Sequence, residues 1–220
     1  MNSKKMVLLG VLVLIGIPFI YAYYLYPSLP AIIPTHFNIR GEADGFGGKD
    51  SIFLGPIIMG VASLFTYFLL ANIKKFDPKR SEQVDDTLFQ KFGFFTVLFL
   101  SALSMVILYA TTHQGMPIEK LLFPIMGLAF AAMGMYMPKI KQNYFAGFKL
   151  PWTLENEDNW NATHKIAGKV WLYGGLVQFF AGMVFSSVTS FVIFFIDMIV
   201  MVLVPTIYSY RMFKNGNKLS

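Results

Sequence analysis

The side chains best suited to acid–base, nucleophilic or metal chemistry are few in this chain and lie far apart in its sequence. There is no cysteine, and the three histidines are His36, His113 and His164. None of them belongs to an H-E-x-x-H motif or to a group of carboxylates, so the sequence favours no metal site. Since no nucleophile, base and orienting group occur together, we predict neither an enzyme nor a bound cofactor.

Two histidines leave a choice between a structural and a chemical role. His36 lies near Asp44, and we expect it either to bond the backbone of its own loop or to act as a pH-sensitive or ligand-contacting group. His164 lies between Trp160 and Trp171. We expect it either to pack at the membrane surface or to transfer protons.

Residues 45–49, G-F-G-G-K, look like the end of a phosphate-binding loop. The motif G-x-x-x-x-G-K needs an earlier glycine, however, and this chain has Ala43 there. The segment therefore predicts no nucleotide site.

Asp197 is the one acidic residue that lies well inside a long apolar run. A carboxylate at such a position costs at least ~2.5 kcal/mol on insertion, so it should face a cavity or a partner. If the last two apolar runs turn near Val188, Gln178 lies opposite Asp197. We expect a protonated Asp197 to hydrogen-bond Gln178, with a proton-relay role for Asp197 as the alternative.

The segment 143–171 is too polar to lie in a membrane, yet it holds all three tryptophans. Thr153 or Asn156 is expected to cap a helix with an acidic first turn. Four residues then share one face of that helix: Trp160, His164, Ala167 and Trp171. We expect the tryptophans Trp152, Trp160 and Trp171 to hold this segment at the lipid headgroups. The cap and charge pattern also suits a surface that receives another protein.

The composition is that of a membrane protein, with 55% hydrophobic residues, 14% charged residues and a mean hydropathy of +0.56. Six apolar runs approach the ~20 residues that a spanning helix requires: 6–26, 52–73, 92–112, 118–137, 170–187 and 188–210. The predicted fold is an all-α membrane protein: a six-helix transmembrane bundle with an extended external loop and a cytoplasmic interfacial helix.

The basic residues are distributed unevenly between the two sides of these six runs. One side carries 15 of the 18 Lys and Arg residues, and the other carries Arg40, Lys49 and Lys120. Because basic loops stay in the cytoplasm, we predict that both termini and the segment 143–171 are cytoplasmic. The same rule explains the net charge of +6 without a nucleic-acid partner.

The external loop, 27–51, has prolines that favour extended backbone and glycines that permit tight turns. Its acidic residues can attract a positively charged ligand. We select as candidate ligand-binding residues Pro30, Pro34, His36, Phe37, Gly41, Glu42, Asp44 and Lys49.

The string G-F-K-L-P-W-T-L, followed by tryptophan, H-K and glycine, resembles the SdpI-like family of bacterial immunity proteins. Lys149 stands where that family usually has arginine, and Leu150 where threonine is usual. The run L-P-A-I-I-P-T-H-F resembles a domain of unknown function that commonly precedes the SdpI-like region. The resemblance divides the chain into a two-span region, 1–73, and a four-span region, 74–220, with a cytoplasmic loop at 139–169. Its motif residues are Asn143, Gly147, Lys149, Pro151, Trp152, Thr153, Trp160, His164 and Gly168.

This resemblance implies a multi-pass protein of the bacterial plasma membrane that protects the cell from a secreted, membrane-active peptide toxin. It also implies a signalling role toward a cytoplasmic repressor. The partners expected are the lipid bilayer, a peptide toxin outside and a regulator inside. The alternative is a small proton-coupled transporter or carrier that uses Asp197.

Overall fold

The computed structural model describes residues 3–76, 86–113 and 117–216, and most of these residues are helical. The chain forms two compact units. The first contains residues 1–72 and 86–125, and the second contains residues 73–85 and 126–220. Helix α5 (Glu119–Tyr136) begins in the first unit and ends in the second.

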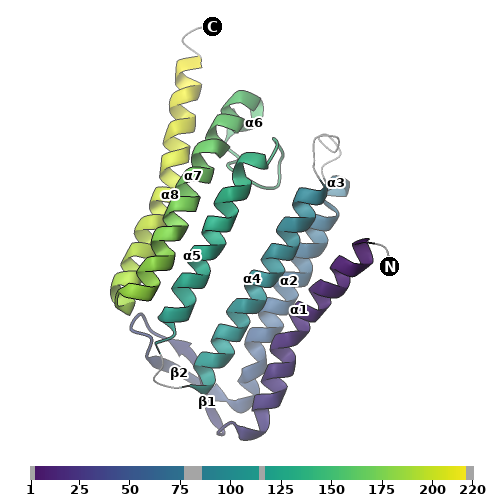
Figure 1. Cartoon of the computed structure of the whole chain (residues 1–220), viewed down its shortest axis with the longest axis vertical. Coiled ribbons are helices and arrows are strands. Elements are labelled where there is room, and N and C mark those ends of the chain that lie inside the picture. The colour runs from purple at the N-terminus through teal and green to yellow at the C-terminus, as the bar shows by residue number, and fades with distance from the viewer. Residues whose placement is uncertain (1–2, 77–85, 114–116, 217–220) are drawn as a thin grey trace. The chain divides into compact units, whose positions relative to one another are not determined.

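Three long helices form the first unit: α1 (Ser3–Leu25), α2 (Leu54–Ala71) and α4 (Asp86–Thr112). Helix α4 packs along both α2 and α1 (Figure 1). The Ser101 hydroxyl on α4 donates a hydrogen bond of 2.7 Å to the Leu14 carbonyl of α1. A short helix, α3 (Ile73–Phe76), follows α2 along the chain.

The loop between α1 and α2 folds into a β-hairpin, which the sequence analysis did not predict. Strands β1 (Ile32–Phe37) and β2 (Ala43–Gly48) pair antiparallel, between two short 3-10 helices, η1 (Tyr26–Ser28) and η2 (Lys49–Phe53). One apolar cluster joins the hairpin to the helices: Ala22, Ile33, Ile52 and Leu108. The hairpin is thus anchored on the end of the first unit.

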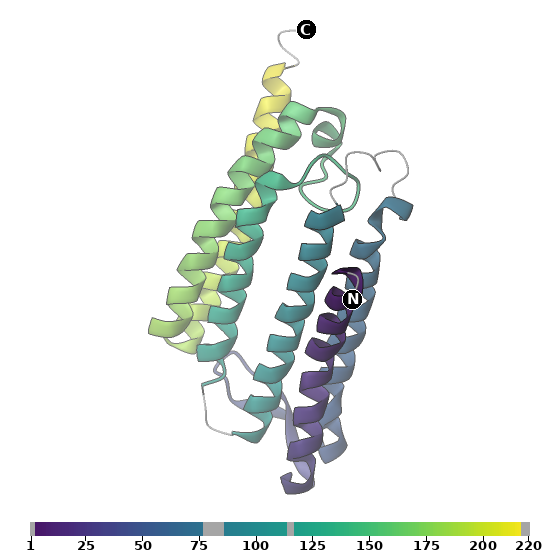
Figure 2. The same ribbon diagram turned by 45° about the vertical axis from the view of Figure 1, so that its right-hand side comes forward.

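The second unit contains α6 (Pro151–Glu155), α7 (Glu157–Val184) and α8 (Ser187–Gly216), with the last part of α5 and the 3-10 helix η3 (Met137–Lys139). Helices α7 and α8 run side by side along most of their lengths (Figures 1 and 2). We expected an interfacial helix and a separate spanning run at 170–187. Both belong to α7, because no helix-breaking residue interrupts 157–184.

Glycines bring the backbones of α5 and α7 into contact. A Cβ atom added at Gly127 would lie 2.6 Å from the Gly175 carbonyl oxygen, and one added at Gly134 would lie 2.7 Å from that of Gly168. No side chain fits between the helices at these positions. This packing mode is common between membrane helices, where small residues allow close approach.

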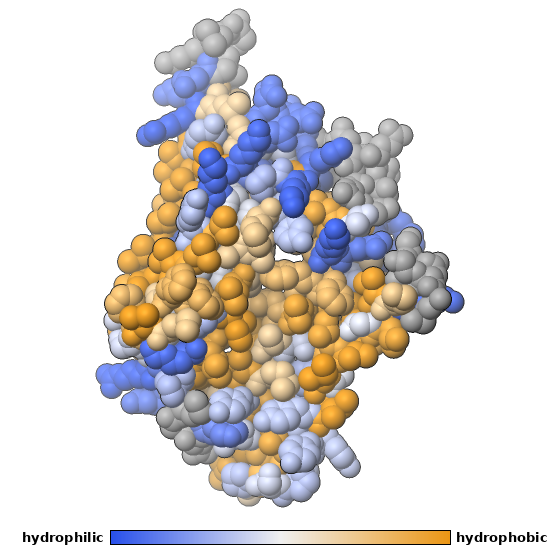
Figure 3. All heavy atoms as spheres, viewed as in Figure 1, coloured by the Kyte–Doolittle hydropathy of each residue, from blue (hydrophilic) through white to orange (hydrophobic). Residues whose placement is uncertain are grey.

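Within the residues that the structure describes, five helices are long and apolar enough to cross a membrane: Lys5–Ser28, Lys49–Ala71, Thr87–Thr112, Glu119–Lys139 and Ser187–Asn215. The predicted class, an all-α membrane protein, is confirmed. Figure 3 shows hydrophobic side chains over the middle of the helices and hydrophilic side chains toward their ends. Apolar side chains such as Ile20, Phe65 and Ile199 are exposed on these helices, as expected for residues that contact lipid.

Candidate functional site

We call the segment 139–169 the connector. The motif residues fold its first part, 139–156, into a compact cap on the start of α7, and its last part, 157–169, begins that helix. Asn156 caps that helix, since its side chain accepts a 2.8 Å hydrogen bond from the Asn159 amide. The other predicted cap, Thr153, closes the preceding turn instead. Its hydroxyl accepts a hydrogen bond from the Leu150 amide and donates one of 2.6 Å to the Phe148 carbonyl.

His164 is the centre of the connector, and only 1% of its surface is exposed. Its Nδ1 lies 2.8 Å from the Trp160 carbonyl oxygen, and its Nε2 lies 3.1 Å from the Phe148 amide nitrogen. A carbonyl only accepts and an amide only donates, so Nδ1 carries the proton and the imidazole is neutral. Burial lowers the pKa of His164, although the Trp160 carbonyl opposes this effect. His164 packs inside the protein against Trp160 and Phe148, and the expected position of this segment at the membrane surface stays a prediction.

Gly147 is required by the position of this histidine. Its φ angle is +116°, a region that favours glycine, and a Cβ atom there would overlap His164 Nε2. The same atom would lie 3.1 Å from the Trp160 ring. Because no larger residue fits, the glycine of the motif allows the connector backbone to reach the imidazole.

Each of the three tryptophans donates its indole N–H to an oxygen atom of the protein. The acceptors are the Ser209 hydroxyl for Trp152, the Ile140 carbonyl for Trp160 and the Met201 carbonyl for Trp171, at 2.7, 2.7 and 3.0 Å. Trp160 is 0% exposed and stacks on His164 with ring centroids 4.1 Å apart. For Trp160, the expected position at the lipid headgroups was wrong, because its indole is enclosed by protein.

A buried polar network that the sequence analysis missed joins the connector to α8. Ser209 accepts from Trp152 and donates a 2.8 Å hydrogen bond to Asn159 Oδ1. Asn159 returns a hydrogen bond of 3.0 Å to the Ser209 carbonyl, and Thr163 donates to Asn159 Oδ1. Every polar side chain in this network therefore has a hydrogen-bond partner. A fully paired network of this kind fixes the connector against α8 without the energetic penalty of an unpaired buried polar group.

Asn143 holds the start of the connector. Its Oδ1 accepts hydrogen bonds from the Phe145 and Ala146 amides, both at 2.8 Å, and its Nδ2 donates to two carbonyls of the same turn. Gly168 packs on α5, as described above. Lys149 and Pro151 are exposed. Most motif residues thus build the connector, and these two remain on its surface.

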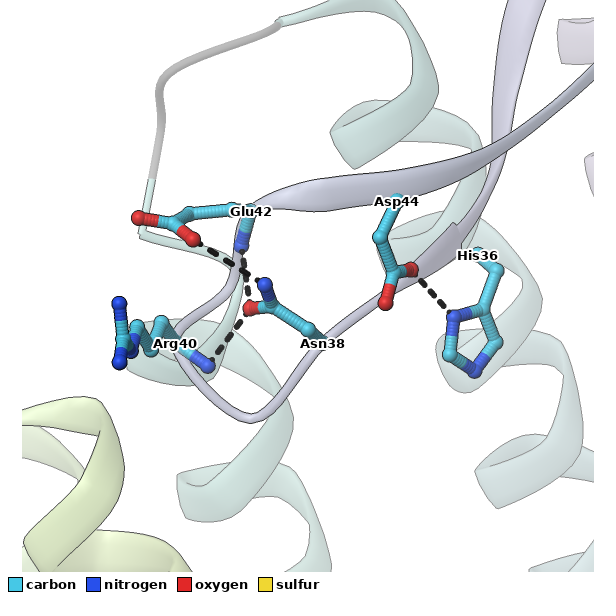
Figure 4. A network of polar contacts seen from close by, with 5 residues as sticks. All are labelled: His36, Asn38, Arg40, Glu42 and Asp44. Atoms are coloured by element: carbon cyan, nitrogen blue, oxygen red, sulfur yellow. Dashed lines mark hydrogen bonds and ion pairs between the residues drawn. The ribbon is translucent and has the colours of Figure 1, made fainter.

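The hairpin brings several predicted loop residues together (Figure 4). His36 Nδ1 lies 2.5 Å from Asp44 Oδ1, so His36 pairs with a carboxylate and not with the loop backbone as one interpretation expected. Asn38, which the sequence analysis did not select, organises the turn. Its Oδ1 accepts from the Arg40 and Glu42 amides at 2.8 and 3.1 Å, and its Nδ2 donates to Glu42 Oε2.

The other selected loop residues are spread along the hairpin. Pro34 is buried, Phe37 is half-buried and Pro30 is exposed. Gly41, with φ +77°, makes the turn, and the Lys49 ammonium lies 4.4 Å from the centroid of the Tyr26 ring. The hairpin also exposes three large apolar side chains: Ile32, Ile39 and Phe46.

The expected bond between Asp197 and Gln178 was wrong. Helix α7 ends at Val184, so the turn comes before Val188 and the facing residues shift. Gln178 Nε2 lies 3.4 Å from the Ser190 carbonyl oxygen, whereas Asp197 faces Gly174. Among the described residues, Gln178 Oε1 and Asp197 Oδ2 are buried without a hydrogen-bond partner.

Two family models match this chain. The SdpI/YfhL protein family matches residues 139–209, which include the connector and most of α8, and a domain of unknown function matches residues 13–60, which include the hairpin. Among curated proteins, the chain is 23% identical over 207 residues to the Immunity protein SdpI of Bacillus subtilis, covering 94% of this chain and 95% of the relative.

An uncharacterized protein of Archaeoglobus fulgidus is 33% identical over 51 residues, which are 23% of this chain and 28% of that protein. No solved structure matches the chain. The motif that builds the connector lies within the first family match, and the similarity to the immunity protein extends over nearly the whole of both chains. The resemblance to the SdpI-like family is therefore confirmed: residues 139–209 match the family, and nearly the whole chain is similar to the immunity protein.

Proposed function

We propose that this protein resides in the bacterial plasma membrane and protects the cell from a secreted, membrane-active peptide toxin. The observation that carries the proposal is the similarity to an immunity protein over 94% of the chain. The folded connector supports it, because the motif residues that carry the resemblance serve one coherent structure rather than lying scattered.

We further propose six membrane crossings with both termini in the cytoplasm. Helix α8 is apolar enough to span, and α7 lies beside it from the bond between Gln178 and Ser190 to the bond between Asn159 and Ser209. A helix that accompanies a spanning helix over this length crosses with it. The concentration of lysine and arginine on one side supports the orientation.

In this orientation the hairpin is external and receives the toxin. Its exposed Ile32, Ile39 and Phe46 offer apolar contact, and the exposed Glu42 and Asp44 offer negative charge. This combination suits a peptide that is both apolar and cationic. Electrostatic attraction would raise the rate of encounter, and apolar contact would supply affinity.

The connector then faces the cytoplasm and presents a basic surface to a regulator. Lys149 and Lys165 are exposed, while the buried motif residues hold the connector rigid. An acidic surface on a repressor would complement these lysines. Replacing Lys149 by glutamate tests this role, because the hydrogen bonds described above for the connector do not involve the Lys149 side chain. Unchanged co-purification of a regulator with this variant would contradict the proposed contact.

The alternative, a proton-coupled carrier, rests on Asp197, whose Oδ2 is buried without a partner among the described residues. Carboxylates inside membrane segments often mark proton paths. The comparisons favour immunity, and Asp197→Asn discriminates the two. A carrier loses transport in this variant, whereas an immunity protein that does not use the carboxylate keeps full protection.

Protection is tested in toxin-sensitive Bacillus subtilis cells that lack their own SdpI and express this chain. The informative variant reverses both hairpin charges, Glu42→Lys with Asp44→Lys. The matched control is Glu155→Lys, an exposed charge reversal in α6. We expect wild type and control to protect and the hairpin variant to fail at equal membrane abundance. Full protection by the hairpin variant would exclude the hairpin as the capture site.

A further inference from the structure

Beneath the hairpin turn lies a carboxylate that the sequence analysis did not select. Glu119 occupies the first turn of α5, and only 8% of its surface is exposed. Its Oε2 is buried and has no hydrogen-bond partner among the residues that the structure describes. Both Glu119 and the hairpin belong to the first unit.

Glu119 lies at a helix end that attracts negative charge, but its surroundings offer no positive partner. The first turn of a helix carries the positive end of the helix dipole. Buried carboxylates are normally paired with a cation. Within the described part of the chain, His36 pairs with Asp44, whereas Glu119 Oε2 has no partner.

Gly41 brings the hairpin backbone directly against the buried oxygen. A Cβ atom at this position would lie 2.7 Å from Glu119 Oε2, so any side chain here would displace the carboxylate. The turn also requires a residue that accepts a φ angle of +77°, which asparagine adopts less readily than glycine. Both the backbone conformation and the short approach to the carboxylate therefore favour glycine.

The hairpin's own cation does not cover this oxygen. Arg40 precedes Gly41, and its side chain is exposed. Figure 4 shows its guanidinium directed away from Asn38 and Asp44 at the outer edge of the turn. Arg40 contributes its backbone amide to the turn, through the bond to Asn38.

We propose that Glu119 is the binding site for a primary ammonium group of the captured peptide, from a lysine side chain or a free N-terminal amine. This inference rests on the proposed function and names the charge that the toxin must present. A single buried oxygen suits the compact ammonium, with its three rotatable donors, better than the planar fork of arginine. The exposed Glu42 and Asp44 attract the cation, and Glu119 binds it.

The test measures peptide binding to the full chain in lipid nanodiscs. The probe is an apolar synthetic peptide of about 20 residues, long enough to enter a bilayer, with a free N-terminal amine. Its N-acetylated twin is the control ligand. We expect wild type to bind the amine on the order of tenfold more tightly, a ratio typical of one charge-assisted hydrogen bond. Glu119→Gln should bind the two peptides equally, and Glu155→Gln, which changes an exposed carboxylate of α6, should keep the preference.

A second variant guards against misfolding. Gly41→Asn places an amide against the carboxylate, so it should also lose the preference, and thermal unfolding checks that the variant remains folded. Equal binding of both peptides by wild type would overturn the inference, as would a preference that survives Glu119→Gln. Binding of Ca²⁺ that depends on Glu119, without any amine preference, would also overturn it and identify an inorganic cation.

The inference and the proposed function fail separately. Immunity is measured by survival of cells that express wild-type chain, and it fails if these cells die with the chain correctly inserted. The amine preference is measured in nanodiscs without any toxin. Protection by wild type without an amine preference would therefore refute the role of Glu119 alone.

Discussion

Replacing Gly147 by alanine tests whether the connector is held by the contact between its backbone and His164. At φ +116° a non-glycine residue costs about 1–3 kcal/mol. The new Cβ atom also overlaps His164 Nε2, so the imidazole must move and the part-buried Phe148 amide loses its acceptor. A part-buried donor left unpaired costs a further ~1–2 kcal/mol, in the lower part of the range for buried donors. We therefore expect Gly147→Ala to lower the free energy of unfolding by about 2–5 kcal/mol.

The assay is chemical unfolding in detergent micelles, followed by tryptophan fluorescence, to which Trp160 contributes together with Trp152 and Trp171. The matched control is Gly16→Ala in α1, where an added Cβ meets no atom within 4 Å. It should be neutral, or stabilising by up to ~1 kcal/mol through helix propensity. If Gly147→Ala is no more harmful than Gly16→Ala, the contact between Gly147 and His164 does not hold the connector.

A double-mutant cycle separates the overlap from the backbone strain. His164→Ala alone removes the acceptor of Phe148 and the stack on Trp160, and it should be destabilising. In this background Gly147→Ala no longer meets the imidazole, so only the strain of ~1–3 kcal/mol should remain. Equal costs of Gly147→Ala in both backgrounds would show that the overlap contributes nothing.

Three further predictions concern the second unit. Ser209→Ala leaves the indole N–H of Trp152 without its acceptor and should destabilise the protein by about 1–3 kcal/mol in the same assay. The control Thr206→Ala removes only a hydrogen bond within α8 and should change stability by less than ~0.5 kcal/mol. Asp197→Asn should leave the unfolding midpoint unchanged at neutral pH, because Asp197 Oδ2 has no hydrogen-bond partner among the described residues. A large decrease in stability would reveal that the carboxylate has a structural partner. Because burial lowers the pKa of His164 in the folded state, the unfolded chain binds more protons at low pH. The contribution of His164 to stability should therefore be complete above its unfolded pKa of about 6.5 and decline as the pH falls below it, and a pH profile that is identical in His164→Gln would contradict this assignment.

The helices could be predicted because the signal for a spanning helix is local. Some twenty consecutive apolar residues are visible without knowledge of any partner. The connector was also foreseen in outline, since Asn156 is a typical cap and the spacing of Trp160 and His164 is helical. What could not be foreseen is which atoms these side chains meet. The indole of Trp152 bonds Ser209, which lies 57 residues further along the chain.

The pairing of Asp197 with Gln178 failed for a geometric reason. In an antiparallel pair of helices, moving the turn by two residues moves every facing residue by about four, which is one helical turn. The polar residues at 186–190 extend from the turn into the start of α8, so hydropathy could not fix the turn to the residue. The hairpin was missed because its strands are short and rich in proline and glycine, which usually weaken a strand signal.

The unbroken course of α7 has a mechanical consequence. A helix of 28 residues is about 42 Å long and transmits a tilt or a shift along its axis with little internal loss. The cap at Asn156 and the bend after Val184 are the two ends of that single rod. Any displacement imposed on the rod at the bend must reappear at His164, so the bend and the connector share one moving part.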